Sequence, residues 1–309
     1  MKRLIIIISG LCVAIAVTAA SIMALRSVPT GEIPYTSPDK AGLLMERAEH
    51  SLAEGAEDKA VSDLTMVINR FGDSGYSNTA LRKLAAIYSA RGEDEKVVYC
   101  YGRLLEDFPD IDDAEDIRSR LEKLIMKKFI SSGDAEESAE YTVQPGDSLY
   151  VLAKKFNTTV ALIKKTNNLE SDMIRVGQKL KINMSKFSIL VDKSDNILVL
   201  KKDGEPFKTY TVSTGKDGST PAGVFQVVDK MISPPWTKPG VGVIMPDSEE
   251  YELGARWIPI SLKGYGIHGT NDESSIGGQV TAGCVRMHND DVVELYDIIP
   301  VGTEVKIVD

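Results

Sequence analysis

Residues 264–270 read Gly-Tyr-Gly-Ile-His-Gly-Thr, and residues 281–287 read Thr-Ala-Gly-Cys-Val-Arg-Met. Together they set one cysteine, Cys284, 16 residues after one histidine, His268, with glycine beside both. A thiol is a weak nucleophile until it loses its proton, and a nearby imidazole can accept that proton. The spacing allows a strand, a loop and a return, so we expect the two side chains to meet in a catalytic site.

Two alternatives stand against this prediction. A lone cysteine is most often a small buried residue that only packs. Here the cation of Arg286 stands two residues away and favours the thiolate, so the joint pattern favours catalysis. His288, four residues past Cys284, is the rival base, but a histidine just before a helix is more often a cap or a surface residue.

The two stretches resemble the signature of the L,D-transpeptidases, the YkuD-type cell-wall enzymes, which read His-Gly-Thr and then Ser/Thr-His-Gly-Cys-hydrophobic-Arg/Asn. The resemblance covers residues 186–309 and departs at Ala282, where the family usually has a second histidine. It implies a mainly-β, sandwich-like catalytic domain that acts on the peptide stems of peptidoglycan.

The resemblance also implies roles for single residues. The Cys284 thiolate would attack a stem carbonyl, His268 would take the thiol proton, and the Gly269 carbonyl would orient the imidazole. The N–H groups of Gly283 and Cys284 are expected to stabilise the oxyanion. Arg286 would pair with a substrate carboxylate or favour the thiolate. The predicted substrate-binding residues are Thr281, Tyr265 and Trp236.

The acceptor decides which reaction follows. An amine from a second stem would attack the acyl-enzyme thioester and form a crosslink, whereas water would make the protein a carboxypeptidase. A non-enzymatic wall tether is the third hypothesis, and Ala282 keeps it open. No metal or other cofactor is expected, because one histidine and one cysteine do not make a zinc site.

The pattern around these motifs is mostly that of strands. Alternating and β-branched residues predict strands at 187–191, 196–200, 210–213, 224–228 and 303–308. Residues 232–250 are rich in proline and glycine, contain Trp236, and are interpreted as a lid or cleft wall. Asn289 is expected to cap a helix that ends before Pro300.

Residues 140–183 predict a strand, two short helices and a closing strand. This order resembles a LysM module, which implies binding of the N-acetylglucosamine chains of peptidoglycan. The alternative is a small folded module that has lost its ligand. Two loops would supply the glycan contacts, through Gly146, Asp147, Ser148, Leu149, Asp172, Met173 and Ile174.

Residues 41–130 have the period of helices, and the apolar pattern from Ala60 to Phe71 returns 37 residues later, from Val97 to Phe108. The segment loosely resembles tetratricopeptide repeats. It is either a spacer that packs on itself or a docking surface for a protein partner. Residues 27–40 and 131–139 are expected to be linkers.

Lys2 and Arg3 precede an uncharged stretch of 22 residues, from Leu4 to Leu25. That length is enough to cross a bilayer, so residues 1–26 are predicted to be a signal anchor in the cytoplasmic membrane, with a cleaved signal peptide as the alternative. The positive-inside rule then places the rest of the chain outside the cytoplasm, in the bacterial cell envelope.

The charge balance is 36 basic against 45 acidic residues, a net charge of −9, which argues against a nucleic-acid partner. Three cysteines do not make a disulfide framework. The sequence therefore predicts a multidomain α+β protein with an N-terminal membrane helix, an α-helical repeat segment, a βααβ module and a mainly-β domain.

Overall fold

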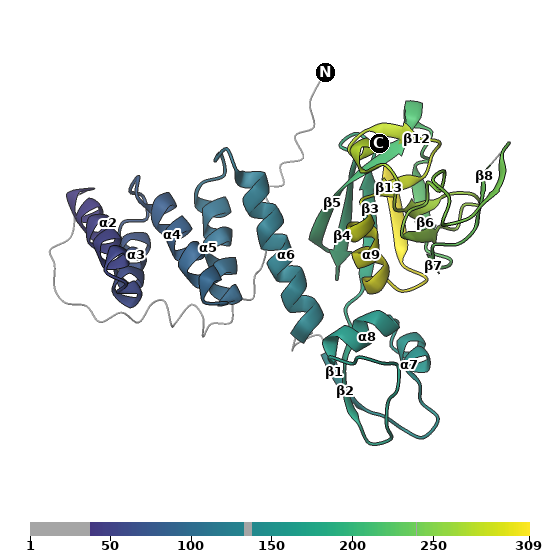
Figure 1. The fold of residues 1–309 in the computed structure, drawn as a ribbon, viewed down its shortest axis with the longest axis horizontal. Helices are drawn as coiled ribbons and strands as arrows, with labels where there is room; N and C mark the ends of the chain where they lie inside the picture. Colours follow the sequence, from purple (N-terminus) through teal and green to yellow (C-terminus); the bar gives the residue numbers. More distant parts are fainter. Residues whose placement is uncertain (1–37, 133–137, 239) are drawn as a thin grey trace. The chain divides into compact units, whose positions relative to one another are not determined.

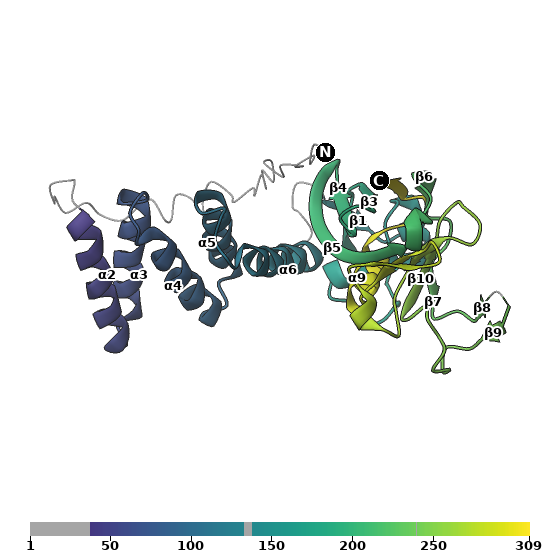
Figure 2. The same ribbon diagram turned by 90° about the horizontal axis from the view of Figure 1, so that it is seen from above.

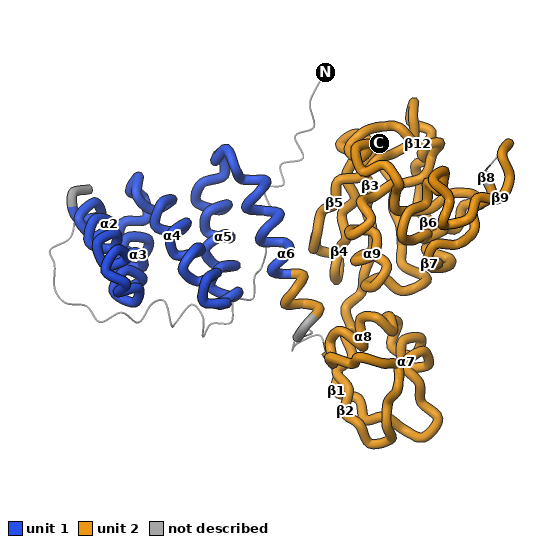
Figure 3. Tube along the Cα trace, viewed as in Figure 1, with its two compact units in different colours: residues 1–125 blue, residues 126–309 orange. Residues whose placement is uncertain are grey.

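The computed structural model describes residues 38–132, 138–238 and 240–309. The chain divides into two compact units at residues 125 and 126 (Figure 3). The predicted anchor at 1–26, and residues 27–37 of the predicted linker, lie outside the described residues. None of the helices in the described ranges has the length and apolar character needed to span a membrane.

The first unit is a row of antiparallel helices (Figure 1). Helices α3 and α5 begin 37 residues apart, as do α4 and α6, so the helices recur at the predicted interval. Their apolar faces share one core, in which Leu64, Leu84 and Leu104 are fully buried. Assignment to tetratricopeptide repeats stays a prediction. The helices are α2 (Pro38–Ala53), α3 (Glu57–Arg70), α4 (Ser77–Ala90), α5 (Asp94–Asp107) and α6 (Ala114–Ser132).

Helix α6 continues past the end of the first unit. From Met126 onward its residues belong to the second unit, where Met126 and Phe129 are buried in the main core. The Phe129 ring meets those of Phe187 and Phe207 edge to face, with centroids 5.8 and 5.1 Å apart. Helical periodicity shows which face is apolar but not which core that face enters, so it did not separate these turns from the repeats.

Residues 138–183 form what we call the βααβ module. Strand β1 (Ser138–Thr142) pairs antiparallel with β2 (Lys179–Asn183), and helices α7 (Leu149–Lys155) and α8 (Val160–Thr166) lie between them in the chain. Ser148 Oγ accepts from Val151 N at 3.2 Å and Thr159 Oγ1 accepts from Leu162 N at 2.9 Å, so both helices have N-caps. The predicted order of elements is confirmed.

Residues 187–308 form what we call the sheet domain. Its strands are β3 (Phe187–Asp192), β4 (Ile197–Lys202), β5 (Glu205–Gly215), β6 (Gly223–Gln226), β7 (Met231–Ile232), β8 (Trp236–Lys238), β9 (Gly242–Ile244), β10 (Arg256–Pro259), β11 (Gly266–His268), β12 (Gln279–Thr281), β13 (Val285–Met287) and β14 (Glu304–Val308). Short 3₁₀ helices lie at Lys216–Gly218 and Glu273–Ser275, and helix α9 spans Asn289–Ile298.

All but two of these strands make one sheet, in the order β6-β14-β3-β4-β5-β13-β11-β10-β7, with β12 beside β5. The sheet curls back on itself, because Val227, just after end strand β6, bridges Ile260, just after β10, the last strand but one at the other end. The long strand β5 bends strongly (Figure 2). The β-rich prediction is confirmed, but instead of two stacked sheets there is one sheet that curls around a core containing α9 residues Val292, Leu295 and Ile298.

Candidate active site

The pairing of β11 with β13 brings the two predicted motifs together. The strands are parallel, with Ile267 opposite Val285 and His268 opposite Arg286. Because side chains alternate along a strand, Ile267 and Val285 enter the core, at 1% and 2% exposed, while His268 and Arg286 lie on the other face. Cys284 directly precedes β13, so the thiol stands at the start of the strand that pairs with the His268 strand.

His268 is held as a neutral base. It is 4% exposed, and its Nδ1 lies 2.7 Å from the Gly269 carbonyl oxygen. Nδ1 must carry the proton to make that hydrogen bond, which leaves Nε2 as the acceptor. Burial, together with the charge of Arg286, lowers the pKa of His268 to about 4, although the Gly269 carbonyl opposes the shift. The imidazole is therefore uncharged at neutral pH.

Cys284 is partly buried, and its Sγ lies 3.8 Å from the Gly264 carbonyl oxygen. Burial raises the pKa of the Cys284 thiol, while a hydrogen bond from the Gly266 backbone and the charge of Arg286 lower it by less. Arg286 was expected to favour the thiolate. It does act in that direction, but loss of solvent outweighs it, so the resting group is a thiol that needs a base.

The loop before Cys284 is held by hydrogen bonds between its own residues. Thr281 is buried, its Oγ1 donates to the Cys284 carbonyl oxygen at 2.7 Å, and it accepts from Gly283 N at 3.1 Å. Thr281 was expected to contact substrate and Gly283 N–H to bind an oxyanion. Both groups make hydrogen bonds within this loop, and their contacts with a substrate stay predictions.

Gly283 has no room for a side chain. Its φ is +132°, and a Cβ there would lie 2.7 Å from a ring carbon of Tyr265. Tyr265, predicted to bind substrate, therefore packs its ring against the backbone beside the nucleophile. This contact explains why glycine precedes Cys284.

Arg286 is held by groups that the sequence pattern did not reveal. Its side chain is 12% exposed, with Nη1 3.0 Å from Ser275 Oγ and Nη2 3.6 Å from Glu252 Oε2. Its Nε is buried and makes no hydrogen bond among the described residues. Glu252 also acts against the lowering of the His268 pKa. Ser275 and Glu252 lie 11 and 34 residues from Arg286, so no local motif marks them.

Asn289 does not cap α9, contrary to the prediction. His288 occupies the N-cap position, without a side-chain cap. Asn289 Oδ1 instead accepts from Ala255 N at 2.9 Å and from Thr270 N at 3.3 Å, while Nδ2 donates to Thr270 O at 2.7 Å. The side chain thus ties the end of β11 to the start of β10. A Cβ on Gly269 would lie 2.3 Å from Asn289 Oδ1, so this tie requires glycine there.

His288, the rival base, points elsewhere. Its Nδ1 pairs with Glu273 Oε2, and its side chain is 42% exposed.

The predicted lid, residues 232–250, contains a hairpin in which β8 pairs with β9 and Trp236 lies opposite Ile244. Trp236 packs against a small cluster of Ile244, Tyr251 and Leu253, and Trp257 packs against the same cluster. The rings of Trp257 and His268 have centroids 5.8 Å apart. The hairpin therefore reaches the His268 surroundings through Trp257.

The glycan-binding residues predicted in the βααβ module have mixed environments. Asp147 Oδ2 accepts from Gln144 N at 2.7 Å and from Tyr141 OH at 2.8 Å, and these bonds lower the pKa of Asp147. Ser148 caps α7 and Leu149 is buried, so the first loop is largely occupied in its own structure. Met173, in the second loop, is 85% exposed.

The second loop, which also holds Ile174, is linked to α8, because Asp172 Oδ1 lies 2.6 Å from Lys164 Nζ. Gly146 lies in the turn before Asp147. Among the described residues there is no group of three or more histidine, cysteine, aspartate or glutamate side chains placed to hold a metal ion.

Comparison with known families agrees with this geometry. A model of the L,D-transpeptidase catalytic domain, YkuD, matches residues 186–307, and a LysM domain model matches residues 141–183. The chain is 46% identical over 127 residues to the YqjB protein of Bacillus subtilis, a match that covers 39% of this chain and 70% of that protein.

The YkuD protein of Bacillus licheniformis is 35% identical over 175 residues, covering 54% of this chain and 97% of that protein. A solved L,D-transpeptidase from Mycobacterium smegmatis is 21% identical, with a TM-score of 0.34, over 44% of this chain and 65% of that chain. YqjB and YkuD both carry the family name L,D-transpeptidase. The chain belongs to the YkuD-type L,D-transpeptidase family, and it is an L,D-transpeptidase whose catalytic domain follows a LysM domain.

Proposed function

We propose that the protein crosslinks peptidoglycan stems through an acyl-enzyme on Cys284. His268 Nε2 takes the thiol proton as Sγ attacks the carbonyl between an L-configured centre and the following D-residue. The carbon–nitrogen bond then breaks, and the imidazolium returns the proton to the leaving amine. A thioester between the stem and Cys284 remains.

In the second half-reaction, a side-chain amine of another stem attacks the thioester. It loses a proton to His268 as the carbon–sulfur bond breaks, and the proton passes to the Cys284 thiolate. Water in place of the amine would release the shortened stem, which is the carboxypeptidase alternative. The hairpin that carries Trp236 is a candidate for excluding water, since desolvation favours an amine that is held in place.

One observation carries this proposal: buried His268, with Nδ1 fixed on Gly269 O at 2.7 Å, lies on β11, which pairs with the strand that Cys284 directly precedes. That bond selects the tautomer in which Nε2 can accept the thiol proton. A merely structural cysteine would gain nothing from a neutral, oriented imidazole on the neighbouring strand.

The remaining site residues have narrower roles in the proposal. The Gly283 N–H is already bound to Thr281, so we assign the oxyanion to the backbone N–H of Cys284. Arg286, with one side near Glu252 and a buried Nε, is proposed to attract a stem carboxylate toward the site. Tyr265 and Trp236 are proposed to line the substrate path.

The LysM domain and the L,D-transpeptidase domain together support peptidoglycan binding and a cell-wall location outside the cytoplasm. We propose that the glycan contacts come from residues 146–149 and 172–174. Residues 1–26 are proposed as the membrane anchor. The helices at 38–125 are proposed to act as a spacer or a docking surface between anchor and wall.

Intact mass after incubation with a carbapenem tests the mechanism, because this class of β-lactam acylates the family's nucleophile. We expect one adduct on the wild-type protein, which peptide mapping places at Cys284. An unmodified protein would overturn the mechanism and favour the wall tether, which needs only glycan binding.

A further inference from the structure

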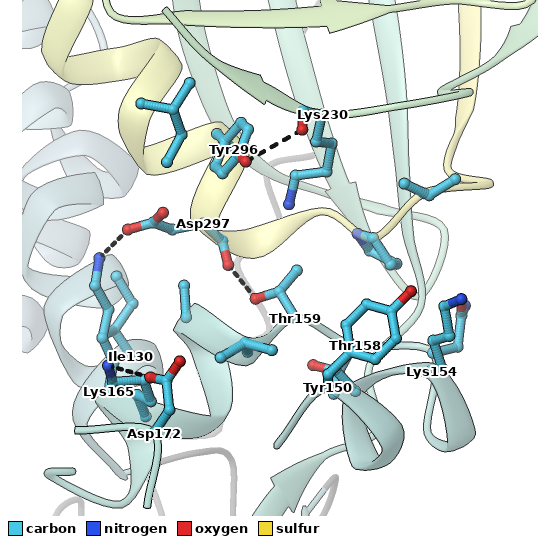
Figure 4. Close-up of a pocket in the computed structure, with 18 of the residues that line it drawn as sticks. Ile130, Tyr150, Lys154, Thr158, Thr159, Lys165, Asp172, Lys230, Tyr296 and Asp297 are labelled. Atoms are coloured by element: carbon cyan, nitrogen blue, oxygen red, sulfur yellow. Dashed lines mark hydrogen bonds and ion pairs between the residues drawn. The ribbon is translucent and has the colours of Figure 1, made fainter. Parts of the chain in front are cut away.

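The second unit contains a cavity of about 1370 Å³ between the βααβ module and the sheet domain (Figure 4). Its walls come from the end of α6, from α7 and α8, and from β7, β10 and the C-terminal end of α9. Six cationic side chains line it against three carboxylates, although the whole chain has a net charge of −9. The cations are Lys127, Lys154, Lys164, Lys165, Lys230 and Arg256.

Two of the three carboxylates are already paired. Asp172 lies 2.6 Å from Lys164 Nζ, and Asp297 lies 2.7 Å from Lys165 Nζ. The third, Asp229, accepts from the backbone N–H of Lys230 at 2.7 Å. The lining carboxylates are thus engaged by Lys164, Lys165 and a backbone N–H, so neither Lys230 nor Arg256 has a lining carboxylate as its ion-pair partner.

The positive charge gathers over aromatic rings. Lys230 Nζ lies 4.2 Å from the centroid of the Tyr296 ring, and the Arg256 guanidinium carbon lies 5.1 Å from it. Across the cavity, Lys154 Nζ lies 4.7 Å from the centroid of the Tyr150 ring. Cations already lie over these rings, so stacking of a neutral sugar on them is disfavoured and binding of an anion is favoured.

Lys230 and Arg256 carry like charges close together and repel each other. Burial, together with Arg256, lowers the pKa of Lys230 to about 8, against the attraction of Asp297. Arg256 Nε is buried and makes no hydrogen bond among the described residues. An anion between the two cations would relieve their repulsion and supply the missing acceptor.

The cavity has walls that are fixed to each other. Thr159 Oγ1 donates to the Asp297 carbonyl oxygen, Lys165 pairs with the Asp297 carboxylate, and Leu162 is buried in the sheet domain's core. Helix α8 is thus attached to the end of α9. A site between walls that are already joined needs little ordering when a ligand binds.

The cavity also lies next to the two loops that are predicted to bind glycan, and Cys284 is not among the residues that line it. Asp172 belongs to the second of those loops, and Tyr150 directly follows the first. On the other wall, Arg256 and Trp257 are consecutive in β10, so their side chains point to opposite faces, with Trp257 toward His268. A ligand beside Arg256 therefore lies behind the strand that borders the catalytic face.

We propose that this cavity binds a carboxylate-bearing peptide stem of the same glycan strand that the βααβ module holds. The inference rests on the proposed function, which makes peptidoglycan the ligand. Stems project from the glycan at regular intervals and end in carboxylates, so a strand held at the loops places an anion beside Lys230 and Arg256. This second stem site would set which stem along the strand reaches Cys284.

The test uses the full chain with Cys284→Ala as parent, so that no turnover occurs. Soluble peptidoglycan strands are titrated calorimetrically, before and after their stem carboxylates are converted to carboxamides. We expect the parent to bind the carboxylate form about tenfold more tightly, as charge-assisted hydrogen bonds predict, and Lys230→Gln to remove most of that difference. Lys306→Gln, at an exposed position on β14, is the matched control and keeps the difference.

Lys154→Gln, at an exposed position on α7, gives a second reading if Lys230→Gln fails to fold, and a reduced preference for the carboxylate form is expected. An unchanged preference in the variants that fold would overturn the proposal. A glycerol-phosphate polymer that binds the parent more tightly than the strands, and loses that binding in Lys230→Gln, would overturn it in favour of a phosphodiester ligand. Carbapenem acylation of the unmutated chain tests the proposed function separately, because that small molecule needs no second stem site.

Discussion

His268 is a buried nitrogen base and Lys230 a half-buried one, on opposite sides of β10, and each lies near an arginine. Burial and Arg286 lower the pKa of His268 to about 4, and burial and Arg256 lower that of Lys230 to about 8. At neutral pH His268 is therefore a free base, whereas Lys230 remains mostly a cation. Imidazole and lysine have different ordinary pKa values, so the same physical causes leave His268 as a proton acceptor and Lys230 as a cation. One face of the strand therefore has a base and the other has an anion site.

The catalytic side of this comparison depends first on the nucleophile. We expect Cys284→Ala to reduce acyl transfer about a thousandfold or more, since the covalent step has no substitute. Turnover of purified muropeptides measures the loss. Binding to sacculi is expected to persist, because the βααβ module has its own core. Retained turnover would remove Cys284 from the mechanism.

The role of His268 as the base is the second feature of this comparison that can be tested. His268→Gln should slow acylation by about a hundredfold or more, the usual contribution of a general base. His288→Gln should change it by about threefold or less, because that exposed ring pairs with Glu273 away from the buried site. Stopped-flow acylation by a carbapenem compares the two variants, and a larger loss at His288 would reverse the assignment.

The pH profile sharpens the comparison. Protonated His268 cannot accept the thiol proton, and its pKa is about 4, so acylation should stay active through pH 6 and fall about tenfold per pH unit only below about 4. An imidazole with the ordinary pKa of about 6.5 would begin to lose activity about 2.5 pH units higher. Carbapenem acylation rates between pH 3.5 and 8, with circular dichroism to check folding, distinguish the two cases.

A smaller effect than at Cys284 or His268 is expected at Ala282, which is exposed and stands where the family usually has a second histidine. Ala282→His should change the acylation rate by about tenfold or less, the scale of one auxiliary hydrogen bond of about 1 kcal/mol. Peptide mapping locates the adduct in both proteins. An adduct that forms only in the variant would mean that this chain has lost catalysis.

Features that depend on neighbouring residues were predictable from the sequence. Alternation at 187–191 and 196–200 predicts β3 and β4, and the apolar period after residue 289 predicts α9. Ser148, a short polar residue directly before an apolar turn, is of the type that caps helices, and it caps α7. The paired motifs also identified Cys284 and His268 as candidates, because glycine, thiol and imidazole at that spacing are specific.

The tertiary structure alone decided how those groups are used. Burial raises the pKa of Cys284 by more than Arg286 lowers it. The N–H of Gly283 is hydrogen-bonded to Thr281, and Asn289 joins β10 to β11. All three features depend on atoms that only folding brings together. Glu252 reaches Arg286 from 34 residues away, and Lys230 meets Tyr296 from 66. Sequence specified the chemical groups and their local turns, whereas pKa and hydrogen-bond occupancy depend on burial and distance, which only the packed chain defines.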